Sequence, residues 1–246
     1  MPDYPHGLGA KPSIPDHRDL IYPMAAGLDQ PVDLRADMPY VWDQGQLGSC
    51  VPHGVLAAVN NAEKRSGIRQ VSGSALFTYY VGRDIEGTTD YDSGLYVRDG
   101  IKAANKGVAD RWAWPYDIER FTEQPPQHAY DSARHAGALT YSRVINGTAG
   151  IAAALRESLP VVIGMTVYPS IFDVDSSGII NVGINDEAPA GGHCMLIVGY
   201  IPSADRYILR NSWSTAWGDE GYGYLAVVDF LRDAFTSDLW VVNNAS

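Results

Sequence analysis

The residues best suited to chemistry are Cys50 and a glutamine that precedes it, Gln44. The segment 44–50 reads Gln-Gly-Gln-Leu-Gly-Ser-Cys, and it leads into a run from Val51 to Arg65 with helical spacing of apolar residues. A thiol at a helix N-terminus lies in the positive field of the helix dipole, which favours the thiolate. Because a thiolate is a strong nucleophile at neutral pH, Cys50 is a candidate nucleophile, expected at the N-cap or first position of this helix.

A nucleophilic cysteine needs a base and a group that orients the base. His193 follows two glycines and precedes an apolar, strand-like segment, and Asn211 follows a second such segment. Cysteine, histidine and asparagine together can serve as nucleophile, base and orienting group. An isolated cysteine at a helix start is more often a small buried hydrophobe, but the combination favours catalysis.

A metal site made of Cys50, His193 and Cys194 would lack a fourth ligand and the usual spacing, so we expect neither a metal nor a cofactor. Cys194 is expected in the core, because neighbouring side chains on a strand alternate between faces. His53 is expected to point away from the site, because it lies three residues along the helix from Cys50.

The elements that must position these residues change in character along the chain. Helical spacing dominates the first half, and β-branched apolar runs dominate the second. A helical half before a sheet half predicts an α+β protein with two lobes, divided between residues 124 and 137. The expected helices are 51–65, 74–87, 95–105 and 151–158, and the expected strands are 138–145, 161–167, 195–200, 207–210 and 222–227.

Composition excludes several classes of protein. The chain has 246 residues, of which 46% are hydrophobic, enough for a sizeable core. Its net charge of −11 would repel a phosphate backbone, so nucleic acid is not an expected partner. Two cysteines are too few for a disulfide framework. Neither a Sec signal nor a membrane-spanning run is visible, which favours a cytoplasmic protein or export by a signal-less route.

Three blocks of sequence resemble the papain (C1-type) family of cysteine peptidases. They are residues 44–50, residues 192–200 and residues 211–222, in the same order as in the family. The resemblance implies a papain-like α+β fold with the cleft between two lobes: a helical left lobe at about 43–130 and an antiparallel, β-barrel-like right lobe at about 136–246. Leu47 stands where the family usually has a disulfide cysteine, and Val51 where it has an aromatic residue.

The resemblance also implies a role for each matching residue. Cys50 would be the nucleophile and His193 its proton-transfer partner, held in orientation by Asn211. Gln44 would donate its side-chain amide to the oxyanion, beside the backbone N–H of Cys50. Trp213 would cover the contact between Asn211 and His193.

Substrate-binding residues are implied less specifically. Residues 92–95 align with the glycine-rich strand that pairs with substrate in the family, so Ser93 and Gly94 would contact the substrate backbone near P2. Gly192 and Met165 would also contact substrate. Met165, with Val167 and Gly191, aligns roughly with the P2 pocket, and such an apolar pocket would favour aliphatic or aromatic P2 residues.

Residues 1–32 form a segment rich in Pro, Gly and Asp without helical or strand periodicity, and we expect an extended arm. The arm precedes residues 31–35, which resemble a mature N-terminus, and it is similar to the short leaders of some bacterial members. Residues 33–246 would then be the catalytic domain. Our hypothesis is that the arm acts like the propeptide of a zymogen, lies over the cleft and limits access.

The expected function is therefore that of a cysteine endopeptidase acting on proteins or peptides. Two alternatives remain: an acyl or amide transferase that uses the same thioester, and a catalytically silent binding homologue. Elsewhere, Trp112, Trp114, Trp217 and Tyr116 are expected to pack in the core or between the lobes, and Arg18 and Asp19 to be solvated charges.

Overall fold

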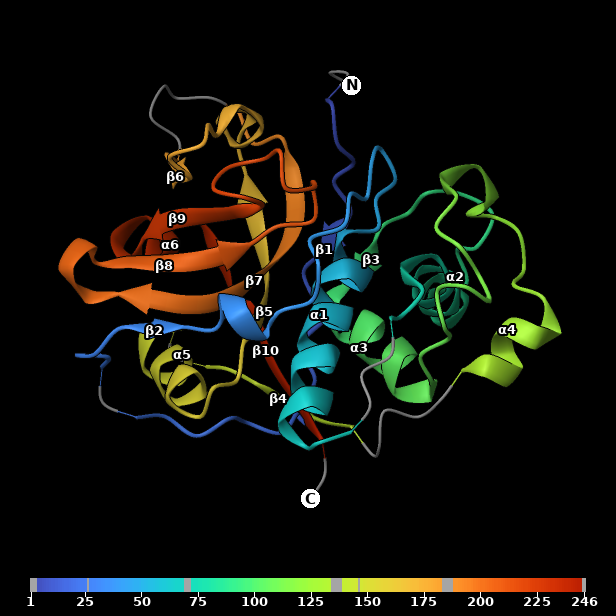
Figure 1. The fold of residues 1–246 in the computed structure, drawn as a ribbon, viewed down its shortest axis with the longest axis horizontal. Helices are drawn as coiled ribbons and strands as arrows, with labels where there is room; N and C mark the ends of the chain where they lie inside the picture. The colour runs from blue at the N-terminus through green and yellow to red at the C-terminus, as the bar shows by residue number, and fades with distance from the viewer. Residues whose placement is uncertain are drawn as a thin grey trace.

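The fold is described by a computed structural model for residues 4–25, 27–68, 72–133, 139–145, 147–182 and 188–244, without the side chains of residues 232–237 and 244. Helices α2 and α3 lie on one side of helix α1 and a large sheet lies on the other (Figure 1). Among the described residues, no helix combines the length and apolar character needed to cross a membrane. The helices are α1 (Cys50–Arg65), α2 (Ala75–Glu86), α3 (Val97–Lys106), α4 (Gln127–Ser132), α5 (Gly147–Arg156) and α6 (Val227–Asp233), with 3-10 turns at Arg35–Asp37, Ile118–Arg120, Pro169–Asp173 and Pro202–Ala204.

The large sheet has eight strands in the order β4-β10-β5-β7-β8-β9-β6, with β2 added beside β7. Neighbouring strands are antiparallel except β6 and β9, which are parallel. Two further strands, β1 and β3, form a separate parallel pair. The strands are β1 (Ala10–Lys11), β2 (Val32–Asp33), β3 (Leu95–Tyr96), β4 (Leu139–Arg143), β5 (Val161–Val167), β6 (Ile179–Ile180), β7 (Gly191–Ile201), β8 (Arg206–Arg210), β9 (Tyr222–Ala226) and β10 (Ala234–Asn244).

Local sequence signals set the helix ends. Ser74 caps α2 by accepting a hydrogen bond from the backbone N–H of Phe77 at 3.0 Å. Gly87 ends the same helix in the left-handed conformation, with φ of 70°. The next helix begins at Val97 and not at Leu95 as expected, because Leu95 donates its backbone N–H to the carbonyl of Gly9 and so forms strand β3.

Helix α1 is buried along most of its length, because it packs between the helices and the sheet. The N-terminus of α1 places Cys50 at the boundary between the helices and the large sheet. Trp114 and Trp217 are buried as expected. Trp112 is not, since 80% of it is exposed. Trp112 lies in a turn, where a ring can remain in solvent, so its residue type alone led to the wrong expectation of burial.

The N-terminal arm is bound firmly to the body between residues 13 and 22. The backbone N–H of Ser13 donates to Asp238 at 3.1 Å, and its hydroxyl accepts from the N–H of Arg98 at 3.0 Å. The guanidinium of Arg98 binds both carboxylate oxygens of Asp19 at 2.9 Å. Asp19 is therefore not the solvated charge that we expected, whereas Arg18 is exposed.

Candidate active site

Cys50 is the first residue of α1 and is fully buried. Burial raises the pKa of its thiol to about 11. The backbone N–H groups of Cys194, Gly9 and Val51 lower that pKa in part, which places the thiol beside the strand that carries His193 and beside the N-terminal arm. The thiol is consequently protonated at neutral pH while the arm covers it.

His193 lies on β7, and its Nε2 is 2.8 Å from Oδ1 of Asn211. Because an amide oxygen only accepts, Nε2 carries the proton and Nδ1 is the unprotonated nitrogen of the neutral ring. Nδ1 is buried and has no hydrogen-bond partner among the described residues. Burial lowers the pKa of His193 to about 4, so the ring is neutral at pH 7 and can accept a proton at Nδ1.

Asn211 follows β8 and is held by its own neighbour, because Oδ1 also accepts the backbone N–H of Ser212 at 2.8 Å. The ring of Trp213 lies over His193, with ring centroids 4.6 Å apart. Trp213 is itself buried against Phe172 and Trp217. The indole therefore covers one face of the His193 ring.

Gln44 is buried, and its side chain is fixed at both ends. Its Oε1 accepts a hydrogen bond from the hydroxyl of Ser212 at 2.6 Å. Its Nε2 donates to the carbonyl of Leu47 at 2.9 Å and to the carbonyl of Gly7 at 3.0 Å. The amide thus already binds a backbone carbonyl oxygen, the group that an oxyanion donor must receive.

The arm approaches the segment before Cys50 through Gly7 and Gly9. A Cβ on Gly7 would lie 2.2 Å from the carbonyl oxygen of Gln46, and a Cβ on Gly9 would lie 2.0 Å from that of Gly48. Only residues without a side chain can approach so closely.

Contacts on both sides of these glycines hold the arm in place. The ring of His6 stacks on Trp213 at 4.8 Å, and Tyr4 stacks on Phe172 at 4.7 Å. Beyond Gly9, Ala10 and Lys11 pair with β3. The arm thus crosses the segment that precedes Cys50, and Figure 1 shows it descending between the two parts of the molecule.

The expected substrate-binding residues do not all lie together. Ser93 and Gly192 line one depression of about 500 Å³, together with residues of the arm. Gly94 has φ of 64°, and a Cβ there would lie 2.1 Å from the carbonyl oxygen of Gly9, so it faces the arm. Met165 is buried opposite His193 in the sheet and lines a separate, very small recess beside Val167.

Comparison with known proteins agrees with this geometry. The model of the papain family of cysteine proteases matches residues 28–229. The chain belongs to this family. It is 34% identical over 216 residues to an uncharacterised peptidase C1-like protein of Acanthamoeba polyphaga mimivirus, which covers 83% of this chain and 70% of that protein. Cathepsin K of Gallus gallus is 28% identical over 193 residues, which covers 76% of this chain and 54% of the relative.

Solved structures show the same fold. Xylellain, a cysteine protease from Xylella fastidiosa, has a TM-score of 0.88 and 30% identity, with 100% of this chain and 99% of that chain covered. Digestive procathepsin L 3 of Tenebrio molitor has a TM-score of 0.70 and 21% identity, with 98% of this chain and 76% of that chain covered. The papain-like α+β fold expected from the sequence is thereby confirmed.

Sequence reasoning missed two groups at this papain-like site. Ser212 orients the side chain of Gln44, although only its place beside Asn211 hinted at a role. The arm residues His6, Gly7 and Gly9 contact the cleft directly. The spacing of the two glycines in an otherwise irregular segment was the available signal, since glycine permits close backbone approach.

Proposed function

We propose that this protein is a cysteine endopeptidase whose N-terminal arm limits access to its own cleft. The observation that carries the proposal is the hydrogen bond from Gln44 Nε2 to the carbonyl of Gly7, because it pairs the expected oxyanion donor with a backbone carbonyl of the arm. The fixed orientation of His193 by Asn211 supports the same reaction.

In the proposed reaction, a proton moves from the Cys50 thiol to Nδ1 of His193 once the cleft is open. The thiolate attacks the carbonyl carbon of a peptide bond, and the oxyanion accepts hydrogen bonds from Gln44 and from the N–H of Cys50. The imidazolium then protonates the leaving amine, which leaves a thioester on Cys50. Neutral His193 finally takes a proton from water, whose oxygen attacks the thioester and releases the acid.

Endopeptidase activity is favoured by the path of the arm. On one side of Gly7, the arm reaches Trp213 and Phe172 through His6 and Tyr4. On the other side, it continues along β3 to the pairing of Lys11 with Glu86. A groove that holds an extended chain on both sides of the catalytic segment suits cleavage within a polypeptide.

The restriction of access has a physical basis in the pKa values. Burial raises the pKa of Cys50 and lowers that of His193, so both residues are neutral while the arm is docked. Displacement of residues 4–9 would admit water and relieve both shifts. The thiolate–imidazolium pair then becomes accessible at neutral pH.

Three proteins test the proposal: the full-length chain, a variant that lacks residues 1–9, and the same variant with Cys50→Ala. We expect the shortened variant to hydrolyse an internally quenched peptide at least tenfold faster than the full-length chain, and Cys50→Ala to abolish hydrolysis. Equal rates for the first two proteins would contradict the role of the arm, and hydrolysis by the alanine variant would contradict the enzyme assignment. Amide products in the presence of an added amine would instead identify a transferase.

A further inference from the structure

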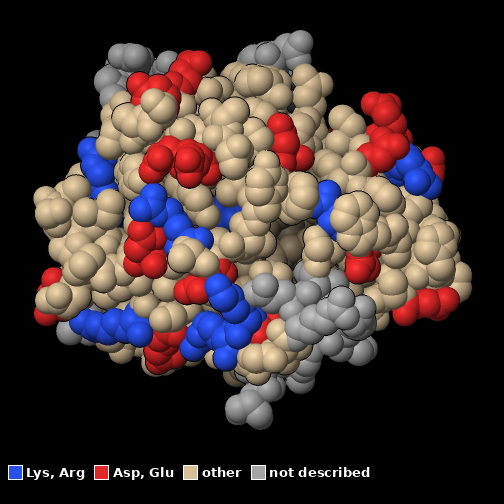
Figure 2. Space-filling view, in the orientation of Figure 1, with Lys and Arg blue, Asp and Glu red and all other residues tan. Residues whose placement is uncertain are grey.

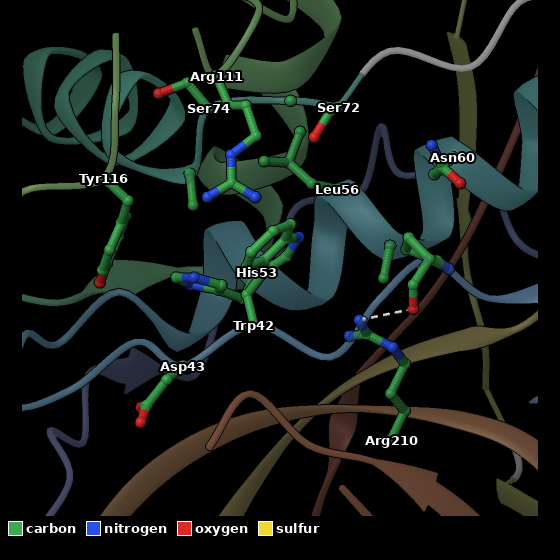
Figure 3. Close-up of a pocket in the computed structure, with 14 residues that line it drawn as sticks. Trp42, Asp43, His53, Leu56, Asn60, Ser72, Ser74, Arg111, Tyr116 and Arg210 are labelled. Carbon is green, nitrogen blue, oxygen red and sulfur yellow. Dashed lines mark hydrogen bonds between the residues drawn. The ribbon is translucent and has the colours of Figure 1, made fainter. Parts of the chain in front are cut away.

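A hollow lies on the front of the molecule, outside the catalytic cleft (Figure 2). Its volume is about 290 Å³, near the lower end of the range for small-molecule sites. Neither Cys50 nor His193 lines it. One wall is formed by α1, and Arg111 and Arg210 approach it from opposite sides (Figure 3).

Arg210, at the end of β8, brings a positive charge that has no carboxylate counter-ion among the described residues, although its side chain also hydrogen-bonds to Tyr222. Only 4% of this residue is exposed, and its guanidinium donates to the carbonyls of Tyr40 at 2.7 Å and Pro39 at 3.3 Å. Its Nε is buried without a hydrogen-bond partner in the described part of the chain. No carboxylate among those residues lies within ion-pair distance of it, although buried charges are normally paired.

Arg111 is the second positive charge at the hollow. Its guanidinium lies 3.4 Å from the ring centroid of Trp42, a stacking contact that leaves its N–H edges free for planar acceptors. No carboxylate that the structure describes lies within ion-pair distance of it, although the charge of Asp110 acts on it from farther away. The carboxylate that does line the hollow, Asp43, is exposed and lies 3.5 Å from His6 of the arm.

His53 adds a hydrogen-bond acceptor to the wall. Its Nδ1 lies 2.9 Å from the carbonyl oxygen of Ser49, and because that oxygen only accepts, Nδ1 carries the proton. Burial, together with the charges of Arg210 and Arg111, lowers the pKa of His53 to about 4, although Ser49 and Asp43 partly oppose this shift. The ring is therefore neutral at pH 7, with an unprotonated Nε2.

We propose that this hollow binds a small organic anion that carries a hydroxyl group. Its carboxylate or phosphate oxygens accept hydrogen bonds from Arg111 and Arg210, and its hydroxyl donates to Nε2 of His53. The anion supplies the negative charge that the two guanidinium groups lack. Arginine suits this role, since it binds planar oxyanions through paired N–H groups. The stacking of Arg111 on Trp42 holds one of these groups in place.

Titration calorimetry on the full-length Cys50→Ala protein tests this proposal with malate, succinate and inorganic phosphate. Malate and succinate differ by one hydroxyl, so we expect malate to bind at least fivefold more tightly. We also expect malate to shift the NMR signal of His53 Nε2, which succinate leaves unchanged. Phosphate binding without malate binding would contradict an organic hydroxy acid as the ligand of this hollow.

Arg111→Gln is the main variant, because Arg111 is only half-buried and we expect its replacement to leave the fold intact. It should weaken binding at least tenfold, and Arg210→Gln should do the same. Arg120→Gln is the matched control, since Arg120 also stacks on a tryptophan, Trp114, but lies outside the hollow. Binding that survives Arg111→Gln, or no binding of any probe at about 10 mM, tenfold above a Kd of about 1 mM, would overturn the proposal.

Discussion

The side-chain amide of Gln44 lies 3.0 Å from the carbonyl oxygen of Gly7. One residue belongs to the segment that leads into the catalytic helix, and the other belongs to the N-terminal arm. The donor that would stabilise an oxyanion is therefore occupied by the chain itself. Any displacement of the arm frees this donor and uncovers the thiol of Cys50 together, because Gly9 lies beside that thiol.

Replacing Gln44 by alanine tests its role at the oxyanion. In the variant that lacks residues 1–9, Gln44→Ala should lower kcat by roughly 100- to 1,000-fold, because one oxyanion donor contributes about 2.7–4 kcal/mol. KM should change little, since the donor acts on charge that develops in the transition state. Steady-state kinetics on a fluorogenic peptide measure both values. Gln127→Ala, on exposed α4, is a control that should leave them unchanged.

Replacing Asn211 by alanine tests whether it positions His193. Loss of the hydrogen bond to Nε2 should lower kcat/KM roughly 5- to 150-fold, which corresponds to about 1–3 kcal/mol of lost transition-state stabilisation. The reason is that the ring loses its fixed tautomer and a buried partner. The pH–rate profile should shift as well, since the bond to Asn211 raises the pKa of His193. The apparent pKa values of the acidic and basic limbs of the pH–rate profile, compared between the variant and the unchanged protein, measure this shift. An unchanged profile and rate would show that Asn211 has no positioning role.

Acid should weaken docking of the arm. Burial lowers the pKa of His6 in the docked arm, and burial also lowers that of His193 beneath it. A histidine whose pKa is lower in the docked form favours docking above its undocked pKa, and this contribution is lost as pH falls. The activity of the full-length chain relative to the variant without residues 1–9 should thus rise between pH 8 and pH 5. Taking the ratio removes the intrinsic pH dependence of the catalytic pair.

His6→Asn in the full-length chain is the control for the pH experiment. Asparagine does not titrate, so the ratio should rise less steeply with acid than in the unchanged chain. A ratio that stays flat from pH 8 to pH 5 in the unchanged chain would contradict a protonation-linked arm.

The fold was predictable where local signals dominate. Ser74 and Gly87 fix α2, and the β-branched run from Val161 to Val167 matches β5 at both ends. Long-range pairing was not predictable. Leu95 lies in strand β3 and not in the expected helix, because its N–H donates to the distant Gly9. Strand β10 was not predicted, because its sequence shows no regular alternation of apolar and polar residues.

In the candidate site too, features set by local motifs were predictable and features set by long-range contacts were not. The types and order of Cys50, His193 and Asn211 indicated the chemistry, because each belongs to a recognisable block. The docking of the arm could be stated only as a hypothesis, because it depends on contacts between segments far apart in the chain. The pairing of Asp19 with Arg98 is one such contact, and charge type alone had suggested a solvated residue.

Arg98 should hold the anchored part of the arm, separately from the part that covers the cleft. Arg98→Met leaves Asp19 as a nearly buried charge without its main partner, although Arg143 lies 4.0 Å away. We expect a loss of about 3–5 kcal/mol in the free energy of unfolding, measured by urea denaturation. The matched control is Arg18→Met, which breaks an exposed pair with Asp16 and should leave the free energy of unfolding nearly unchanged, because solvent screens such a pair.

Two deletion variants separate anchoring of the arm from covering of the cleft. If residues 13–22 hold the arm and residues 4–9 cover the cleft, deletion of residues 1–9 removes no contact of Arg98 and should leave the unfolding free energy of the anchored region nearly unchanged. Deletion of residues 1–31 removes Ser13 and Asp19 and leaves both Asp238 and Arg98 without partners from the arm. We therefore expect the longer deletion to destabilise the protein at least as much as Arg98→Met. Equal stability of the two deletion variants would show that the arm is not anchored by these contacts.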